Sequence, residues 1–342
     1  MHAPLPSTFG PEGAAGSAGS AAHEHTAAHV AASTAGPETP FADPFADRAV
    51  DTRIGQLLQQ AGKLTAESAE RVARTQQELG LRFGAAAMRL GLVNQEDVDA
   101  AIARQFAYPL AARGDSALSA KLVAAYAPAG IQGDTLRAIR SQLLLRWFGS
   151  GRHALAISGV GSGDASSVLA ANLALVFAQL GQRTLLVDAN LRHGVQHALF
   201  GLHAQGAAQP GFSRPGIARA GPWAGLSDVL AGRAGLDAIV AVPGFPALSL
   251  LASGTVPPNP QELLERASFH TLHAQLGKLY DVVLYDITPT SHGAEALAVA
   301  AHAGAALLVA EKDRTPVAAL KRLAQQMAGA DVAVIGSVLV EA

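Results

Sequence analysis

A glycine-rich turn is the part of this sequence most suited to phosphate chemistry. It reads S-G-V-G-S-G-D-A-S-S over residues 158–167, after an apolar run over 153–157 and before a helix-forming stretch. In a strand–turn–helix unit, the N–H groups of the turn and the amino end of the helix bind anions. The residues expected to surround a nucleotide phosphate are Gly161, Gly163, Ser166 and Ser167.

The same turn lacks the lysine on which phosphoryl transfer depends. A working loop would place glycine at position 165, lysine at 166 and serine or threonine at 167. The sequence has Ala165 and Ser166 there, and it contains no lysine between Lys121 and Lys278 that a shifted register could use. Only Ser167 is retained, as a candidate Mg²⁺ ligand. We therefore expect normal folding, weak phosphate binding and poor catalysis.

Two aspartates follow apolar runs of strand length. Asp188 follows the run over 184–187, and Asp286 follows the run over 281–284. Ligands of parallel sheets bind at the carboxyl ends of the strands, so both aspartates are expected at the edge of the sheet where a ligand would bind.

The elements that would position these residues alternate between strands and helices from His153 onward. Short apolar runs separated by helical segments predict an α/β fold with a doubly wound, mostly parallel sheet. The runs cover residues 153–157, 184–187, 248–251, 281–284, 305–310 and 332–338. A further helix is expected over 133–148, before the first strand.

An internal repeat precedes this α/β segment and predicts a small all-helical domain. Each copy has an arginine, a glycine that ends a short helix, and a residue that caps the next helix. These are Arg53, Gly62 and Thr65 in the first copy, and Arg82, Gly91 and Asn94 in the second.

The composition divides the chain into four parts. Residues 1–52 are rich in small and polar residues and are expected to form a disordered tail. The helical repeat occupies 53–110, a linker and interface helix occupy 111–150, and the α/β domain occupies 151–342. The formal net charge of −2 lacks the excess of positive charge that is typical of a nucleic-acid-binding protein. No leader and no apolar run of membrane-spanning length is evident, so we expect membrane association only through a partner.

The α/β segment resembles the bacterial tyrosine kinases of exopolysaccharide export, which have a P-loop ATPase fold. The matching motifs are L185-L-V-D188-A-N190, V282-V-L-Y-D286-I-T-P289, the block over 254–264, A-A-N-L-A over 170–174, and D134-x-x-R137-x-x-R140. This resemblance implies ATP and Mg²⁺ as cofactors and autophosphorylation on tyrosine as the activity. It also implies that Asp188 and Asp286 are catalytic residues and that, together with Ser167, they are ligands of Mg²⁺. It implies an inner-membrane polysaccharide co-polymerase, or chain-length determinant, as the partner. It also implies a cytoplasmic location at that membrane and homo-oligomers formed through Arg137 and Arg140.

The repeat resembles the N-terminal domain of type II secretion and pilus ATPases, which can bind cyclic di-GMP. That resemblance implies that Arg53 and Arg82 contact this ligand, with Gly55 and Gly84 beside them. The structural alternative is a pair of arginines that start helices beside tight turns.

Departures from the kinase pattern leave three functions open. Asn190 replaces the second carboxylate of a D-x-D motif, Glu295 is the best match to a later aspartate, and the C-terminus lacks a tyrosine cluster. The first function is a regulatory or scaffolding protein of polysaccharide export with impaired catalysis. The second is an active tyrosine autokinase. The third is a positioning ATPase of the partition type, which would need a lysine at position 161, where this chain has glycine.

Overall fold

The computed structural model describes most of the chain after residue 53. The described residues are 54–106, 108–111, 117–127, 130–161, 163–202, 224–289 and 295–341. The expected tail over 1–52 and the candidate ligand residue Arg53 lie outside the described residues.

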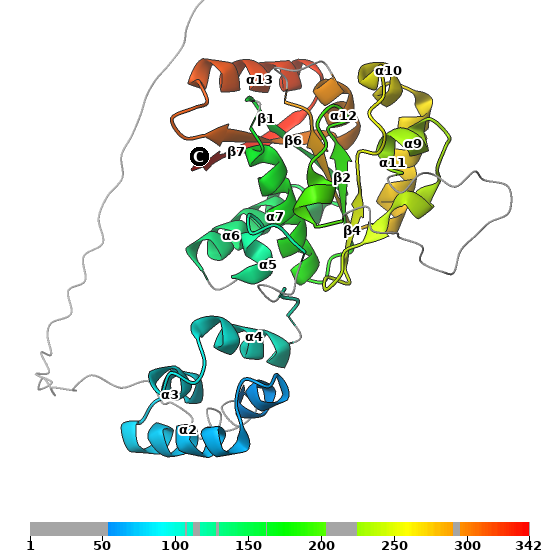
Figure 1. The fold of residues 1–342 in the computed structure, drawn as a ribbon. Coiled ribbons are helices and arrows are strands. Elements are labelled where there is room, and N and C mark those ends of the chain that lie inside the picture. The colour runs from blue at the N-terminus through cyan, green and yellow to red at the C-terminus, as the bar shows by residue number, and fades with distance from the viewer. Residues whose placement is uncertain are drawn as a thin grey trace, which may run out of the picture. The chain divides into compact units, whose positions relative to one another are not determined.

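The repeat segment consists of short helices, and the predicted helix boundaries are confirmed. Residues 54–60 are helical, followed by α2 (Ala66–Leu79), α3 (Phe83–Arg89) and α4 (Gln95–Gln105) (Figure 1). Thr65 caps α2 by accepting a hydrogen bond from the Ser68 N–H, and Asn94 caps α4 by accepting one from the Asp97 N–H. Gly62 and Gly91 have φ values of 69° and 68°, a conformation that favours glycine.

The α/β segment contains a seven-stranded sheet in the order β3-β4-β2-β5-β1-β6-β7. All neighbouring pairs are parallel except β3 with β4. The strands are β1 (Ala154–Gly159), β2 (Thr184–Ala189), β3 (Val240–Ala241), β4 (Leu248–Leu251), β5 (Val282–Ile287), β6 (Ala305–Glu311) and β7 (Ala333–Val340). The expected doubly wound, mostly parallel sheet is therefore confirmed, with one short antiparallel edge strand that the sequence patterns did not predict.

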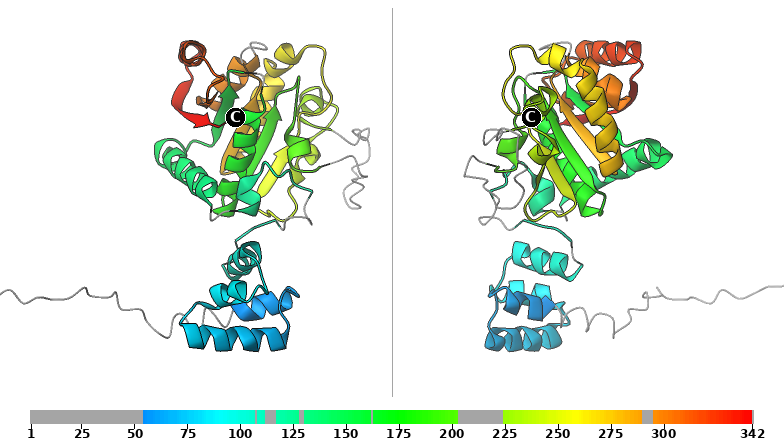
Figure 2. Two further views of the ribbon diagram at one scale, coloured as in Figure 1. Left: turned by 60° about the vertical axis from the view of Figure 1, so that its left-hand side comes forward. Right: turned by 90° about the vertical axis from the view of Figure 1, so that its right-hand side faces the viewer.

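Helices cover both faces of this sheet (Figure 1, Figure 2). One hydrophobic cluster includes residues of α5 (Val123–Tyr126), α6 (Ile131–Arg146), α7 (Ala165–Gln179) and α8 (Gln196–Leu199). The other includes residues of α9 (Leu226–Leu230), α10 (Pro260–Leu264), α11 (Ala267–Leu279), α12 (Glu295–Ala303) and α13 (Val317–Gly329). Single turns of 3₁₀-helix occur at Phe148–Ser150 and Leu236–Ala238. Among the described residues, no helix is long and apolar enough to cross a membrane.

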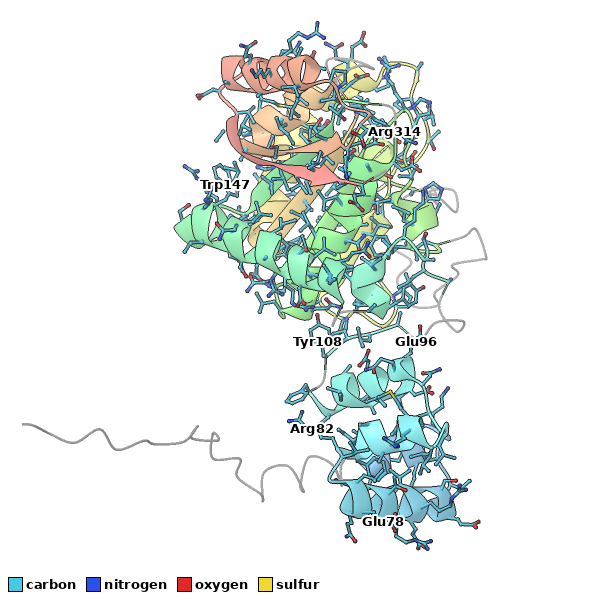
Figure 3. All side chains as sticks on the ribbon, turned by 90° about the vertical axis from the view of Figure 1, so that its left-hand side faces the viewer. Glu78, Arg82, Glu96, Tyr108, Trp147 and Arg314 are labelled. Carbon is cyan, nitrogen blue, oxygen red and sulfur yellow. The ribbon has the colours of Figure 1, made fainter. Side chains whose placement is uncertain are left out.

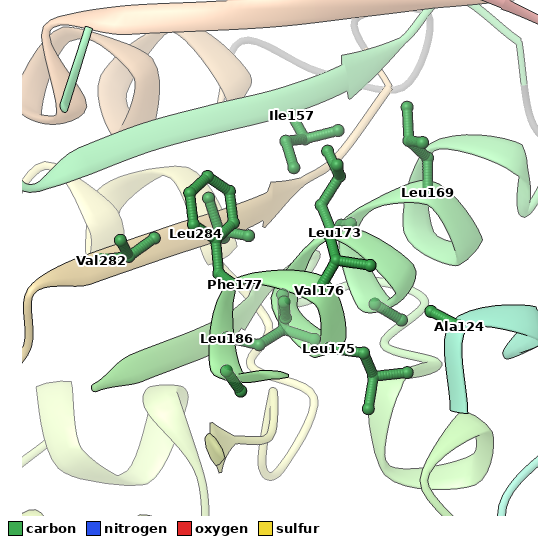
Figure 4. Packing of buried hydrophobic residues seen from close by; sticks show 14 of the residues in the cluster. Ala124, Ile157, Leu169, Leu173, Leu175, Val176, Phe177, Leu186, Val282 and Leu284 are labelled. Carbon is green, nitrogen blue, oxygen red and sulfur yellow. The ribbon is translucent and has the colours of Figure 1, made fainter. Parts of the chain in front are cut away.

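Helix α7 is the element that places the glycine-rich turn against the sheet. Its apolar side chains pack on β1, β2 and β5, where Leu173 and Phe177 contact a layer that includes Ile157 and Leu284 (Figure 4). Both Leu173 and Phe177 are fully buried. Burying each such side chain contributes roughly 1.5–3 kcal/mol, so the start of α7 is held firmly at the carboxyl end of β1.

The first residues after the repeat segment are tied to the far end of α7. The Tyr108 hydroxyl donates to Gln179 Oε1 at 2.7 Å, and Gln179 Nε2 donates to the carbonyls of Pro109 and Ala124 at 3.1 and 2.8 Å. Tyr108 and Pro109 therefore pack with the α/β segment, slightly before the boundary expected at residue 110.

Candidate functional site

The glycine-rich turn lies between β1 and α7, as the strand–turn–helix pattern predicted. Ser166 and Ser167 are in the first turn of α7 and are both buried. Gly159 ends β1 so close to this helix that a Cβ atom on it would lie 3.2 Å from Ser166 Oγ. The Ser166 side chain thus faces the end of β1 and carries no charge toward the turn.

Folding brings Lys121 to the turn from outside the motif. Its Nζ lies 3.3 Å from Asp164 Oδ2, and both side chains are exposed. Asn172 of α7 holds this segment by donating to the Lys121 carbonyl at 3.1 Å. The positive charge of Lys121 is thus paired with the carboxylate of Asp164, which belongs to the turn itself.

A second carboxylate, that of Glu311, lines the hollow of the turn. Glu311 is the last residue of β6, and its Oε1 lies against Gly163, where an added Cβ atom would be only 2.6 Å away. The hollow that remains measures about 10 Å³ and is lined by residues including Gly161, Gly163, Ser166, Glu311 and Thr315. Glu311 also pairs with Arg314 at 3.3 Å. A volume of this size holds about one water molecule, so a phosphate group could enter only if the turn or Glu311 moved.

Asp188 and Asp286 lie side by side, as expected, but inside the strands and not beyond their ends. They are directly paired in the register of β2 with β5, and both are fully buried. The strands extend to Ala189 and Ile287, past the apolar runs seen in the sequence, because a parallel ladder continues through the aspartates. The Oδ1 atom of each aspartate is buried without a hydrogen-bond partner.

The side-chain amide of Gln196 lies between these carboxylates and the turn. Gln196 is fully buried at the start of α8, and its Nε2 donates to Asp286 Oδ2 at 2.7 Å and to the Ser167 carbonyl at 2.9 Å. Its backbone N–H donates to Asp188 Oδ2 at 3.0 Å. Gln196 Oε1 is buried without a partner. Gln196 therefore contacts both aspartate carboxylates and the backbone of Ser167.

Burial changes the protonation of this pair. It raises the pKa of Asp188 well above its ordinary value, and the neighbouring charge of Asp286 adds to the effect. Burial also raises the pKa of Asp286, and the hydrogen bonds from Gln196 and Ser167 offset part of that increase. Two carboxylates this close favour one shared proton or a cation between them.

The donor set fits a divalent cation better than it fits a nucleotide. Orphaned carboxylate oxygens of Asp188 and Asp286, with the Ser167 hydroxyl nearby, are the hard oxygen ligands that Mg²⁺ prefers. The turn fits a triphosphate poorly, because Ser166 is uncharged and the Glu311 carboxylate lines the hollow.

Asn190 and Glu295, two departures from the kinase pattern, have structural roles. Asn190 Oδ1 accepts hydrogen bonds from the Thr288 hydroxyl at 3.2 Å and the His193 N–H at 3.1 Å. Glu295 is buried at the start of α12, and its Oε1 lies 2.5 Å from Arg192 Nη2. Asn190 and Glu295 therefore bind neighbouring residues in this structure. Gln196 is the residue that contacts both aspartates.

The two arginines of the α6 motif have different partners in this structure. Arg137 pairs with Asp134, whereas Arg140 donates from Nη1 to the Val176 carbonyl of α7 at 2.8 Å. Arg140 is thus partly buried inside the fold, and oligomerisation through this helix stays a prediction.

The candidate cyclic di-GMP residues of the repeat segment are divided between surface and core. Arg82 is exposed and precedes α3 (Figure 3). Gly55 and Gly84 are buried, and Cβ atoms on them would lie 3.0 Å from the Phe83 ring and 2.8 Å from Val98 Cγ1. The glycines are therefore required by helix packing, a role that needs no ligand.

Three site residues were missed by the sequence reasoning: Lys121, Gln196 and Glu311. Lys121 and Gln196 belong to no motif, and only folding brings them to the turn. Glu311 could have been found from the sequence, because it directly follows the apolar run over 305–310 and therefore lies at the carboxyl edge of the sheet.

Three relatives show what this chain is similar to, whereas no protein-family model matches it. EpsB of Ralstonia solanacearum is 31% identical over 205 residues, which cover 60% of this chain and 25% of EpsB. Tyrosine-protein kinase Wzc of Salmonella typhi is 30% identical over 190 residues, covering 56% of this chain and 24% of Wzc. Tyrosine-protein kinase CpsD of Streptococcus agalactiae is 29% identical over 202 residues, covering 59% of this chain and 80% of CpsD. The chain thus spans about a quarter of the length of EpsB and Wzc.

Solved structures of related proteins also match the α/β segment. The kinase domain of Escherichia coli tyrosine kinase ETK matches with a TM-score of 0.56 and 28% identity, covering 64% of this chain and 78% of that domain. The chimerical protein CapA2B2 matches with a TM-score of 0.56 and 24% identity, covering 70% of this chain and 96% of that protein, which supports the fold alone. The homologues of this chain are bacterial tyrosine-protein kinases, and its structural neighbours are P-loop kinase domains.

Proposed function

We propose that this chain is a regulatory or scaffolding P-loop protein of exopolysaccharide or capsule export, with impaired kinase activity. The observation that carries this proposal is Ser166, a buried neutral residue at the position where phosphoryl transfer requires lysine. Charge must be neutralised on the γ-phosphoryl oxygens as the bond breaks, and Ser166 supplies none. The remaining charges beside the turn are paired, Lys121 with Asp164 and Arg314 with Glu311.

In this proposal the partner is an inner-membrane polysaccharide co-polymerase of the chain-length-determinant type. The chain would act on the cytoplasmic side and reach the membrane through that partner, as the resemblance to the export kinases implies. Asp188, Asp286 and Ser167 would bind Mg²⁺, and the turn around Gly161 and Gly163 would bind ATP weakly. Residues 53–110 would form a separate helical domain, 111–150 a linker and interface helix, and 151–342 the kinase-like domain.

The alternative is an active tyrosine autokinase, in which a positive charge comes from outside the turn. Lys121 is the observation that favours it, because its ammonium group already lies beside Asp164. The test is radiolabelled ATP with the purified full chain and the cytoplasmic segment of the co-polymerase. Phosphotyrosine at the level of an intact family kinase would overturn the impaired function. Loss of that signal in Lys121→Ala would identify the source of the charge.

Binding of cyclic di-GMP by the repeat segment is a separate proposal. It depends on Arg82, because the packed glycines offer no access for a ligand. An arginine can stack on guanine and pair with phosphate. Calorimetric titration of the full chain to high micromolar ligand tests it, with Arg82→Ala as the variant that should lose binding.

A further inference from the structure

Side chains of this chain contact both places where a magnesium–nucleotide complex would carry charge. The Glu311 carboxylate lines the hollow of the turn, where a phosphate would bind. The Gln196 amide donates to Asp286 Oδ2, an oxygen of a predicted cation ligand, and to the Ser167 backbone carbonyl. We propose that Glu311 and Gln196 are specificity-determining residues that weaken the binding of magnesium–nucleotide at this site. This inference rests on the proposed function and explains at the site why catalysis would be impaired.

Glu311 can oppose phosphate binding through its negative charge and through the space that its side chain takes. Its Oε1 contacts Gly163, and its carboxylate carries the same sign as a phosphate group. Its ion partner Arg314 lies in the same turn, so removal of the carboxylate would free a guanidinium beside the hollow. The change Glu311→Gln keeps the side-chain size, removes the repulsion and releases Arg314 for phosphate.

Gln196 is placed to act on the cation. Its Nε2 donates to Asp286 Oδ2 the hydrogen bond that a cation would replace, and a second hydrogen bond to the Ser167 backbone carbonyl holds the amide in place. In this arrangement, the Oδ1 atoms of both aspartates and Gln196 Oε1 are buried without hydrogen-bond partners. Hydrogen bonds to charged groups are among the stronger ones in proteins, so a cation must displace them to enter. Removal of the amide should therefore raise cation affinity.

The chain offers a matched control for each substitution. Asp313→Asn removes one negative charge from the same turn as Glu311, and asparagine tolerates its φ of 60°. Gln179→Ala truncates a second buried glutamine of the same domain, whose amide binds Pro109 and Ala124 far from the aspartates. Gln196→Met removes the amide while keeping most of the volume, and it replaces Gln196→Ala if that variant unfolds.

The experiment is calorimetric titration of the full chain with ADP alone, with Mn²⁺ alone, and with both. Glu311→Gln should tighten ADP binding at least about ten-fold over the parent, a change of about 1.4 kcal/mol, while Asp313→Asn leaves it unchanged. Gln196→Ala should tighten Mn²⁺ binding by a similar factor without nucleotide, while Gln179→Ala does not. The double variant Glu311→Gln with Gln196→Ala should bind the metal–nucleotide complex most tightly.

Two results would overturn the inference. The first is micromolar binding of Mn²⁺–ADP by the parent chain, because the site would then be open. The second is equal binding by the variants and their controls. Neither result decides the proposed function, since binding without phosphotyrosine formation still leaves a catalytically impaired protein. Autophosphorylation of the parent would contradict the proposed function directly.

Discussion

The Arg192 guanidinium pairs with the Glu295 carboxylate at 2.5 Å, although the two residues are separated by about a hundred positions in the chain. This pair connects the segment after β2 to the start of α12. Glu295 is buried, whereas Arg192 is partly exposed. The best sequence match to a late catalytic aspartate is therefore used to hold two elements of the site together.

Removal of Arg192 should destabilise the fold through the carboxylate that remains. Arg192→Ala leaves Glu295 buried and without its cation, which should cost about 1–3 kcal/mol, reduced from the value for a fully buried pair because Arg192 is partly solvated. Urea unfolding at pH 7 measures the loss. The double variant Arg192→Ala with Glu295→Gln should recover part of it. Arg183→Ala, which breaks an exposed pair with Asp281, should have the smaller effect.

The patterns that could be read from the sequence were local ones. The caps Thr65 and Asn94 and the turns at Gly62 and Gly91 depend on residues within one helical turn, and the structure has them as predicted. The fold class followed from alternating strand-length and helix-length segments. The proximity of Asp188 and Asp286 followed from the rule that parallel strands present their carboxyl ends at one edge.

The features that the sequence could not provide are contacts between distant segments. Gln196 reaches Asp286, and Lys121 reaches Asp164, across many intervening residues. The position of Glu311 in the hollow depends on β6 lying next to β1, which the strand order decides. No local spacing encodes that order. The motifs of the site could thus be predicted from the sequence. The side chains that contact them from distant segments, such as Gln196 and Glu311, could not.

Packing at Gly84 should make the repeat segment sensitive to the smallest substitution. Gly84→Ala places a Cβ atom 2.8 Å from Val98 Cγ1, so the helices must shift. We expect a net loss of about 1–3 kcal/mol from overpacking, even though alanine favours helix more than glycine does. Thermal unfolding followed by circular dichroism measures it. Arg82→Ala, on the surface, should unfold like the parent, and a parent-like Gly84→Ala would contradict the packing explanation.

A histidine cluster should make stability fall on acidification. His273 on α11 accepts or donates a hydrogen bond with the Tyr285 hydroxyl at 2.9 Å, and it faces His270, His302 and the more distant His153. Burial lowers the pKa of His273 first, and the neighbouring histidines add to this.

The direction of the pH effect follows from that shift. Below the ordinary histidine pKa of about 6.5, the unfolded chain binds more protons than the folded one. Stability contributed by neutral His273 is therefore complete above about pH 6.5 and decreases as the pH falls toward 5. Urea unfolding at several pH values should show this slope, and His273→Gln should flatten it. Parallel profiles for parent and variant would rule out His273 as the source.

Repair of the turn should need more than the missing lysine. Ala165→Gly with Ser166→Lys restores the motif at the start of α7, and the intact β1 and α7 should hold it in place. The new ammonium group would enter the hollow that Glu311 lines, and an ion pair with that carboxylate would neutralise its charge. We therefore expect measurable but weak binding of Mg²⁺–ATP by this double variant. Adding Glu311→Gln should strengthen binding at least about ten-fold, because the lysine and Arg314 then both face the phosphates. Calorimetry on the parent, the double variant and the triple variant makes the comparison. If the triple variant binds no better than the parent, the backbone of the turn itself has lost the shape that holds a nucleotide.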